Sequence, residues 1–178
     1  MRTPEDTPTD ADQLIRLGTI ASVDLAAARC VVELDDDSKT GPVRWMESRM
    51  GKTRWWSPPS VGEQVVLLCP GGEIGAAVVL RGLASDTFAP AGNSTKELIE
   101  FEDGAVLSYD PEAHAMEVVL PAGGTLSIIA PGGINLDADV HCTGTLTADV
   151  DVVGGGKSLK GHKHGGVQGG GAQTSAPV

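Results

Sequence analysis

Residues 134–152 (INLDADVHCTGTLTADVDV) carry the pattern that decides how this chain folds. Apolar side chains occupy nearly every even position, and Asp, Asn, His or Thr occupies every odd position. A period of two places alternate side chains on opposite faces of an extended strand. The segment therefore predicts β-structure with one apolar face and one acidic or hydroxylic face.

The same phase begins upstream, so the whole of residues 98–152 reads as one strip of short strands separated by turns. Neither a helical period nor a second sheet in the sequence is available to cover its apolar face. We therefore expect three copies to wind around a common axis, with the even residues inward and every strand edge paired. An ordinary β-sandwich half that packs on the N-terminal domain remains the structural alternative.

The composition favours the all-β class. The chain has 178 residues, among which 24 Gly and 11 Pro mark many turns, while Phe, Trp and Tyr total only six. Hydrophobic residues make up 40%, which is too many for a disordered chain. No apolar run is long enough to span a membrane, and the N-terminus is polar and acidic, so we expect neither a membrane span nor a secretory leader.

The N-terminal half predicts a small closed barrel. Residues 1–13 form a flexible acidic arm without an apolar period, and residues 14–88 contain five short apolar strands. The first strand alternates at Leu17, Thr19, Ala21 and Val23. Turn-forming residues then make residues 89–97 a linker between the barrel and the strip.

The net charge narrows the classes of molecule that the chain can bind. The net charge is −11, and residues 98–152 hold ten acids and no Lys or Arg. Such a surface repels phosphate backbones, so we expect no nucleic-acid partner.

The three cysteines are predicted to be reduced, core-type thiols, because Cys30, Cys69 and Cys142 lie far apart in apolar contexts.

His162 and His164 have the only metal-ligand spacing in the chain. Residues two apart on an extended strand point to the same side, so both imidazoles face one direction. On a threefold axis, six such imidazoles would form an octahedral nitrogen shell, which suits Fe(II), leaves Ni(II) and Co(II) open, and disfavours tetrahedral Zn(II). A surface pair of histidines is the alternative interpretation. His114 and His141 are expected to have no metal role, and no catalytic constellation is visible.

Two stretches resemble a known family. Residues 59–73 (PSVGEQVVLLCPGGE) and the following apolar strand resemble the barrel of the phage baseplate assembly protein V family, the central spike proteins of contractile tails. Residues 162–168 (HKHGGVQ) resemble the tip of those spikes. The order of barrel, linker, strip and His-x-His tip matches the family from residue 14 to the C-terminus.

The resemblance implies an architecture. Residues 14–88 would be an N-terminal OB-fold, residues 98–155 an intertwined trimeric triple-stranded β-helix, and residues 156–178 an apex. There, His162 and His164 of each chain would supply six ligands to one iron ion per trimer. Calcium and chloride also occur near the apex of related spikes, and no residue of this chain is assigned to them.

The resemblance also implies a structural rather than enzymatic role. The homotrimer would be made in the host cytoplasm, attach to a baseplate hub protein at the tail tip of the virion, and pierce the host outer membrane when the sheath contracts. A trimeric, fibre-like adhesin or receptor-binding tip is the first alternative function. A cell-wall-cleaving enzyme is the second.

Overall fold

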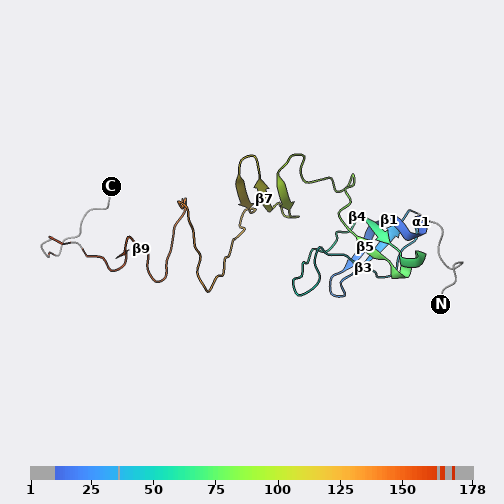
Figure 1. Ribbon diagram of the computed structural model, residues 1–178, viewed down its shortest axis with the longest axis horizontal. Helices are drawn as coiled ribbons and strands as arrows, with labels where there is room; N and C mark the ends of the chain where they lie inside the picture. The colour runs from blue at the N-terminus through green and yellow to red at the C-terminus, as the bar shows by residue number, and fades with distance from the viewer. Residues whose placement is uncertain (1–10, 36, 164, 167–169, 171–178) are drawn as a thin grey trace. The chain divides into compact units, whose positions relative to one another are not determined.

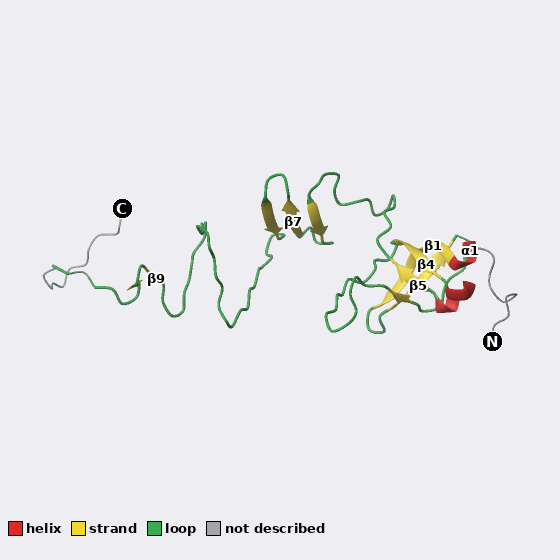
Figure 2. Ribbon diagram, in the orientation of Figure 1, coloured by secondary structure: helices red, strands yellow, loops and turns green. Residues whose placement is uncertain are grey.

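The computed structural model describes residues 11–35, 37–163, 165–166 and 170, and most of its regular secondary structure is strand, joined by long loops (Figure 2). It divides into two units, Met1–Leu126 and Ser127–Val178. No helix in the described ranges is long and apolar enough to cross a membrane. The helix and strands are α1 (Ala11–Leu14), β1 (Ile15–Asp24), β2 (Arg29–Leu34), β3 (Arg44–Trp45), β4 (Gln64–Leu68), β5 (Val78–Leu80), β6 (Glu97–Glu100), β7 (Val106–Asp110), β8 (Ala115–Val119), β9 (Val153–Gly154) and β10 (Lys157–Ser158).

The first five strands form a closed barrel (Figure 1). Their order in the sheet is β2-β1-β4-β5-β3, with a parallel pair between β3 and β5 and antiparallel pairs elsewhere. Reciprocal backbone hydrogen bonds between Cys30 and Val43, at 3.0 and 2.9 Å, join the two edge strands. This bridge brings the two edges of the sheet together, and the strand order is that of an OB-fold.

The phase of β1 differs from the one that its sequence alternation suggested. Gly18 and Ile20 face the core, whereas Leu17 is 48% exposed. A β-bulge between Ile20 and Ser22 then shifts the register, and Val23 packs against the core. Gly18 is required because a Cβ there would lie 2.6 Å from Val32 Cγ1 and 2.7 Å from the Glu33 carbonyl oxygen. Close packing of β2 on β1, rather than local periodicity, therefore selects the inward residues.

The barrel core is small, aliphatic and tightly packed. Cys30 and Cys69 are buried in it as free thiols, as predicted, and burial raises the pKa of both. Cys142 is also free and is exposed in the single chain; because it lies on the apolar, even-numbered face of the strip, its assignment as a core-type thiol stays a prediction. The buried hydrophobic residues of this core are Ile20, Cys30, Val32, Leu34, Val43, Val65, Leu67, Cys69, Ala77 and Val79.

Helix α1 takes up the last residues of the predicted flexible arm, and residues 1–10 lie outside the described ranges. After the barrel, strands β6, β7 and β8 form an antiparallel sheet in that order. Strand β6 begins at Glu97, the last residue of the predicted linker.

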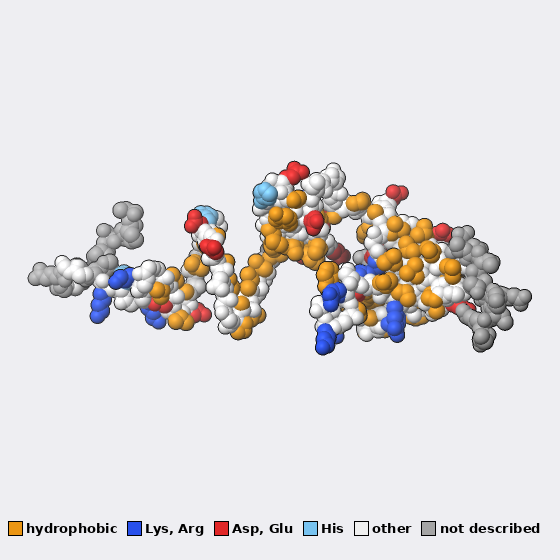
Figure 3. Space-filling model, in the orientation of Figure 1, with side chains coloured by type: hydrophobic (Ala, Val, Ile, Leu, Met, Phe, Trp, Pro, Cys, Tyr) orange, Lys and Arg blue, Asp and Glu red, His pale blue; other side chains and the backbone are white. Residues whose placement is uncertain are grey.

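Residues 120–152 contain no strand in the single chain, although their sequence alternates as strongly as any in the protein. Figure 1 shows them as an extended chain that reverses at its turns. A strand is defined by hydrogen bonds to a neighbour, and successive passes of this segment make none of the ladders seen in the barrel. Its apolar side chains are consequently in contact with solvent (Figure 3).

Candidate functional site

The C-terminal candidate site rests on a tight hairpin. Strands β9 and β10 pair antiparallel through Lys157 with Gly154 and Ser158 with Val153. The two residues between them, Gly155 and Gly156, have φ values of 54° and 77°. Both conformations are in the left-handed region that glycine adopts without strain, and two such residues make the turn that suits a two-residue hairpin.

Asp151 ties this hairpin to the chain on both sides of it. Its Oδ1 accepts the N–H groups of Val152, at 2.8 Å, and Lys160, at 3.1 Å. The pKa of the Asp151 carboxyl lies below its ordinary value, chiefly because the Ser158 hydroxyl donates to it. The Ser158 oxygen in turn accepts the Gly161 N–H at 2.8 Å. These bonds fold the chain into a turn just before His162.

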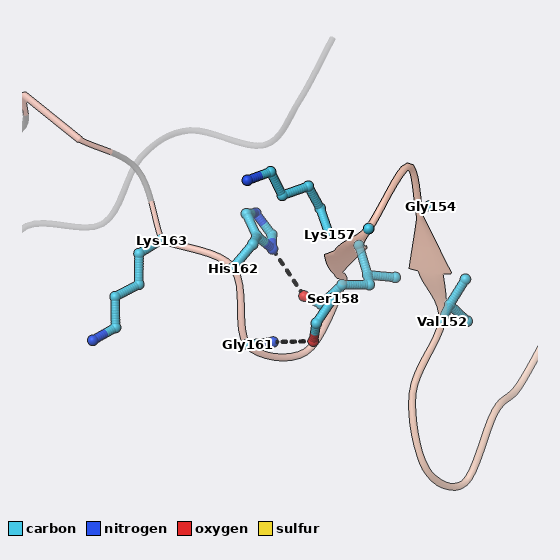
Figure 4. Close-up of a pocket in the computed structure, with 9 residues that line it drawn as sticks. Val152, Gly154, Lys157, Ser158, Gly161, His162 and Lys163 are labelled. Atoms are coloured by element: carbon cyan, nitrogen blue, oxygen red, sulfur yellow. Dashed lines mark hydrogen bonds between the residues drawn. The ribbon is translucent and has the colours of Figure 1, made fainter.

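His162 is exposed, and its ring is oriented by that turn (Figure 4). Nδ1 lies 3.0 Å from the carbonyl oxygen of Leu159. Because a carbonyl oxygen can only accept, Nδ1 is the donor in this contact, and in the neutral ring the lone pair is then on Nε2. A backbone carbonyl that fixes the tautomer in this way is the usual support of a metal-binding imidazole.

His162 also lines a pocket of about 800 Å³ beside the β9–β10 hairpin, with Val152, Lys157 and Lys163 among its walls. His164, the second predicted ligand, lies outside the described residues. Within the described part of the chain, no three His, Cys, Asp or Glu side chains come together as a metal-binding group. His114 stands in the turn between β7 and β8 with a φ of 52°, and His141 is exposed.

A second candidate region, which the sequence reasoning missed, is the loop of residues 46–57 between β3 and β4. Its base is fixed by Glu47, whose side chain is only 2% exposed and forms an ion pair with Arg81 at 2.8 Å. Burial by itself raises the pKa of Glu47, but hydrogen bonds from Ser57, Trp45 and Arg81 outweigh it and hold the pKa below its ordinary value. The concentration of Trp, Met and basic residues in this loop is the sequence signal that could have revealed it.

Comparisons with known proteins agree with both ends of this description. The family model of the Type VI secretion system/phage-baseplate injector OB domain matches residues 16–83, and the GpV Apex motif matches residues 158–178. The spike protein of Escherichia phage P2 is 35% identical over 198 aligned positions, which cover 93% of this chain and 92% of the relative. This chain belongs to the phage baseplate spike family.

Membership of the spike family confirms several expectations. The barrel is the OB domain of a baseplate injector, the chain is a structural protein of a phage tail spike, and its place is the tail of the virion. The all-β class and the N-terminal OB-fold are likewise confirmed. The ligand role of His162 and His164 and the identity of the ion stay predictions.

Proposed function

We propose that three copies of this baseplate spike intertwine into a needle that pierces the host outer membrane when the tail sheath contracts. The observation that carries the proposal is the exposure of the apolar phase of the C-terminal strip. In the single chain Leu136 is 70% exposed, Leu146 77% and Val150 80%, although all three lie on the apolar face predicted from the sequence.

The exposed face is too apolar to remain in water. Burying an aliphatic side chain of this size stabilises a fold by about 1.5–3 kcal/mol. The same segment also leaves its backbone N–H and C=O groups without ladder partners, and a second and third chain would supply them. A triple-stranded β-helix meets both needs at once, because it places the even residues on the axis and the acidic odd residues in solvent.

A metal ion at the apex fits the described geometry of His162 and the sequence position of His164. Each chain supplies two imidazoles at His162 and His164, and a threefold axis brings six together. The tautomer of His162 leaves Nε2 as the ligating nitrogen, while the turn held by Asp151 sets the direction of the ring. Bound iron would cross-link the three chains at the tip, where fraying of the strands would otherwise begin.

Piercing requires a rigid body rather than a catalyst. Bending a shaft whose strands are all paired across chains must break many hydrogen bonds together, so a needle of this kind transmits the force of sheath contraction. The barrels would remain at the blunt end, attached to a hub protein of the baseplate.

The mass of the protein in solution tests whether three chains form the shaft. Size-exclusion chromatography with light scattering should give three times the chain mass of 18.3 kDa. Leu136→Asp with Leu146→Asp places carboxylates on the apolar face and should abolish the trimer. Thr145→Asp with Thr147→Asp, on the opposite face, is the matched control and should leave the trimer intact. A monodisperse wild-type monomer would refute the proposal.

Metal analysis tests the apex. We expect about one iron per trimer, and His162→Ala with His164→Ala should remove it while the trimer mass stays unchanged. Iron retained by the double variant would refute the ligand assignment.

Tails that carry a spike truncated after residue 155 separate piercing from receptor binding. A piercing needle predicts normal adsorption to cells and loss of outer-membrane permeabilisation, measured by uptake of a dye that the intact membrane excludes. Loss of adsorption itself would favour the receptor-binding tip.

A further inference from the structure

The loop of residues 46–57, here called the basic finger, has a composition unlike the rest of the chain. It holds two of the three Trp residues and two of the four Met residues of the protein. It also holds Arg49, Lys52 and Arg54, within a chain whose net charge is −11. Tryptophan, methionine and arginine are the residues enriched at protein–protein interfaces, where Trp and Arg also dominate the binding energy.

The base of the finger is clamped to the barrel. Arg81, which follows β5, donates from Nε to the Met46 carbonyl at 3.1 Å, from Nη1 to the Ser57 carbonyl, and from Nη2 to Glu47 at 2.8 Å. Glu47 Oε1 accepts the N–H of Ser57 at 3.0 Å and the indole N–H of Trp45 at 2.9 Å. One guanidinium and one carboxylate thus close the loop at both ends.

The finger is also ordered along its length. Met50 and Arg54 form an antiparallel bridge, the Trp55 N–H donates to the Arg49 carbonyl at 3.0 Å, and the Gly51 N–H donates to the Thr53 carbonyl at 3.1 Å. At its base, the ring of Trp56 lies 5.6 Å from that of Trp45, which packs on the barrel core. A surface that is ordered before binding loses less conformational entropy when it binds.

The side chains of the finger face solvent. Met50 is 66% exposed, Trp55 56% and Trp56 57%. None of the ion pairs found among the described residues involves Arg49, Lys52 or Arg54. Figure 3 shows Lys and Arg side chains gathered at one edge of the N-terminal unit. Large apolar groups and cations outside these ion pairs together form a surface that has no counterpart among the described residues.

We propose that the basic finger is the docking surface of the spike for the baseplate hub, and that the hub presents an acidic protein surface with an apolar notch for Trp55. The inference rests on the proposed function, because it names the part of the barrel that makes the attachment. Charge complementarity selects this partner: a carboxylate-bearing surface would satisfy the three cations and speed association. The outer face of β1 and β5 is also apolar, at Leu17 and Leu80, but exposed leucines by themselves do not select a partner by charge.

A protein surface is favoured over nucleic acid. The acidic strip of residues 98–152 accompanies every finger and repels a phosphate backbone beyond short range. A protein partner needs only one local acidic patch, whereas a nucleic acid carries negative charge along its whole backbone.

Binding of purified full-length spike to tails assembled without it tests the proposal. Lys52→Glu with Arg54→Glu should weaken binding at least tenfold and reduce its dependence on salt concentration. Trp55→Ala should weaken binding about tenfold with the salt dependence retained. Lys157→Glu with Lys160→Glu makes the same change in net charge near the other end of the chain and should bind as wild type does.

Three results would each overturn the proposed docking site. Equal tail binding by wild type and both finger variants, with trimer mass and far-ultraviolet circular dichroism unchanged, would overturn the docking site and leave the proposed needle intact. Unchanged tail binding, with loss of binding to a short single-stranded DNA, would assign the finger to nucleic acid. Unchanged tail binding, with loss of association between spike trimers, would assign it to another copy of the chain. Both of these results overturn the proposal.

Discussion

At the scale of single residues, Glu47 links the barrel to the basic finger. We expect Glu47→Gln to lower the free energy of unfolding of the barrel by about 1–3 kcal/mol at neutral pH, because the partly buried Arg81 loses its opposite charge while its hydrogen bonds to two backbone carbonyls remain. All three Trp residues, at positions 45, 55 and 56, lie in or beside the finger, so Trp fluorescence during urea unfolding reports on the barrel alone.

The contribution of Glu47 depends on pH in a defined direction. Its pKa in the folded protein is depressed, so its stabilisation is fully present above the ordinary Glu value of 4.5 and is lost as the pH falls through the lower folded value. The stability difference between wild type and Glu47→Gln should therefore shrink below pH 4.5. Glu73→Gln is the control, because Glu73 forms none of the ion pairs in the described part of the chain. A difference that stays constant down to pH 2 would contradict the assignment.

Gly18 is the second residue with a measurable consequence. Gly18→Ala adds a methyl group 2.6 Å from Val32 Cγ1 and 2.7 Å from a backbone oxygen, so strand β2 must move. We expect a loss of about 1–3 kcal/mol in barrel stability, measured by the same urea titration. Gly51→Ala, where an added Cβ meets nothing within 4 Å, is the matched control and should change stability little.

At the scale of elements, the β9–β10 hairpin depends on Asp151. We expect Asp151→Asn to weaken the bonds that its carboxylate accepts from Ser158 and Lys160, and so to loosen the turn before His162. Hydrogen exchange of peptides that cover residues 150–163 should become severalfold faster. Asp149→Asn, an exposed change two residues earlier, should leave the exchange rate unaltered. Equal hydrogen-exchange rates in the two variants would show that Asp151 does not stabilise the turn before His162.

The strip of residues 120–152 shows how an element can be predicted from sequence and yet be missing from a single chain. Its alternation predicts strands because side-chain facing is a local property of the backbone. A strand also needs a hydrogen-bonding neighbour, and consecutive passes of this strip do not pair with each other. We therefore expect the strip to form strands only when other chains pair with it.

At the scale of the whole molecule, we expect the unfolding midpoint of the shaft to depend on protein concentration and that of the barrel to be independent of it. The barrel has its own closed core, whereas the proposed shaft gains its core only by association. We expect the midpoint of shaft unfolding, followed by far-ultraviolet circular dichroism, to fall on the order of 5 °C for each tenfold dilution. The barrel transition, followed by Trp fluorescence, should not move. A shaft midpoint that is independent of concentration would contradict the trimer.

The sequence by itself determined the class of the fold, the order of its parts and the family. Strand alternation, turn residues and the His162-x-His164 spacing are short-range patterns, and the barrel strands lie where such patterns predict them. The residues of the OB barrel and the apex are distinctive enough to indicate the spike family from the sequence alone.

Only the tertiary structure decided which residues of β1 face the core and how the basic finger is held. Gly18 and Ile20 point inward because β2 packs closely on β1, a contact that periodicity does not encode. The ion pair of Glu47 and Arg81 joins residues 34 positions apart through the closure of the barrel. Contacts at such separations exist only once the chain has folded back on itself, so their energy has no local signature in the sequence.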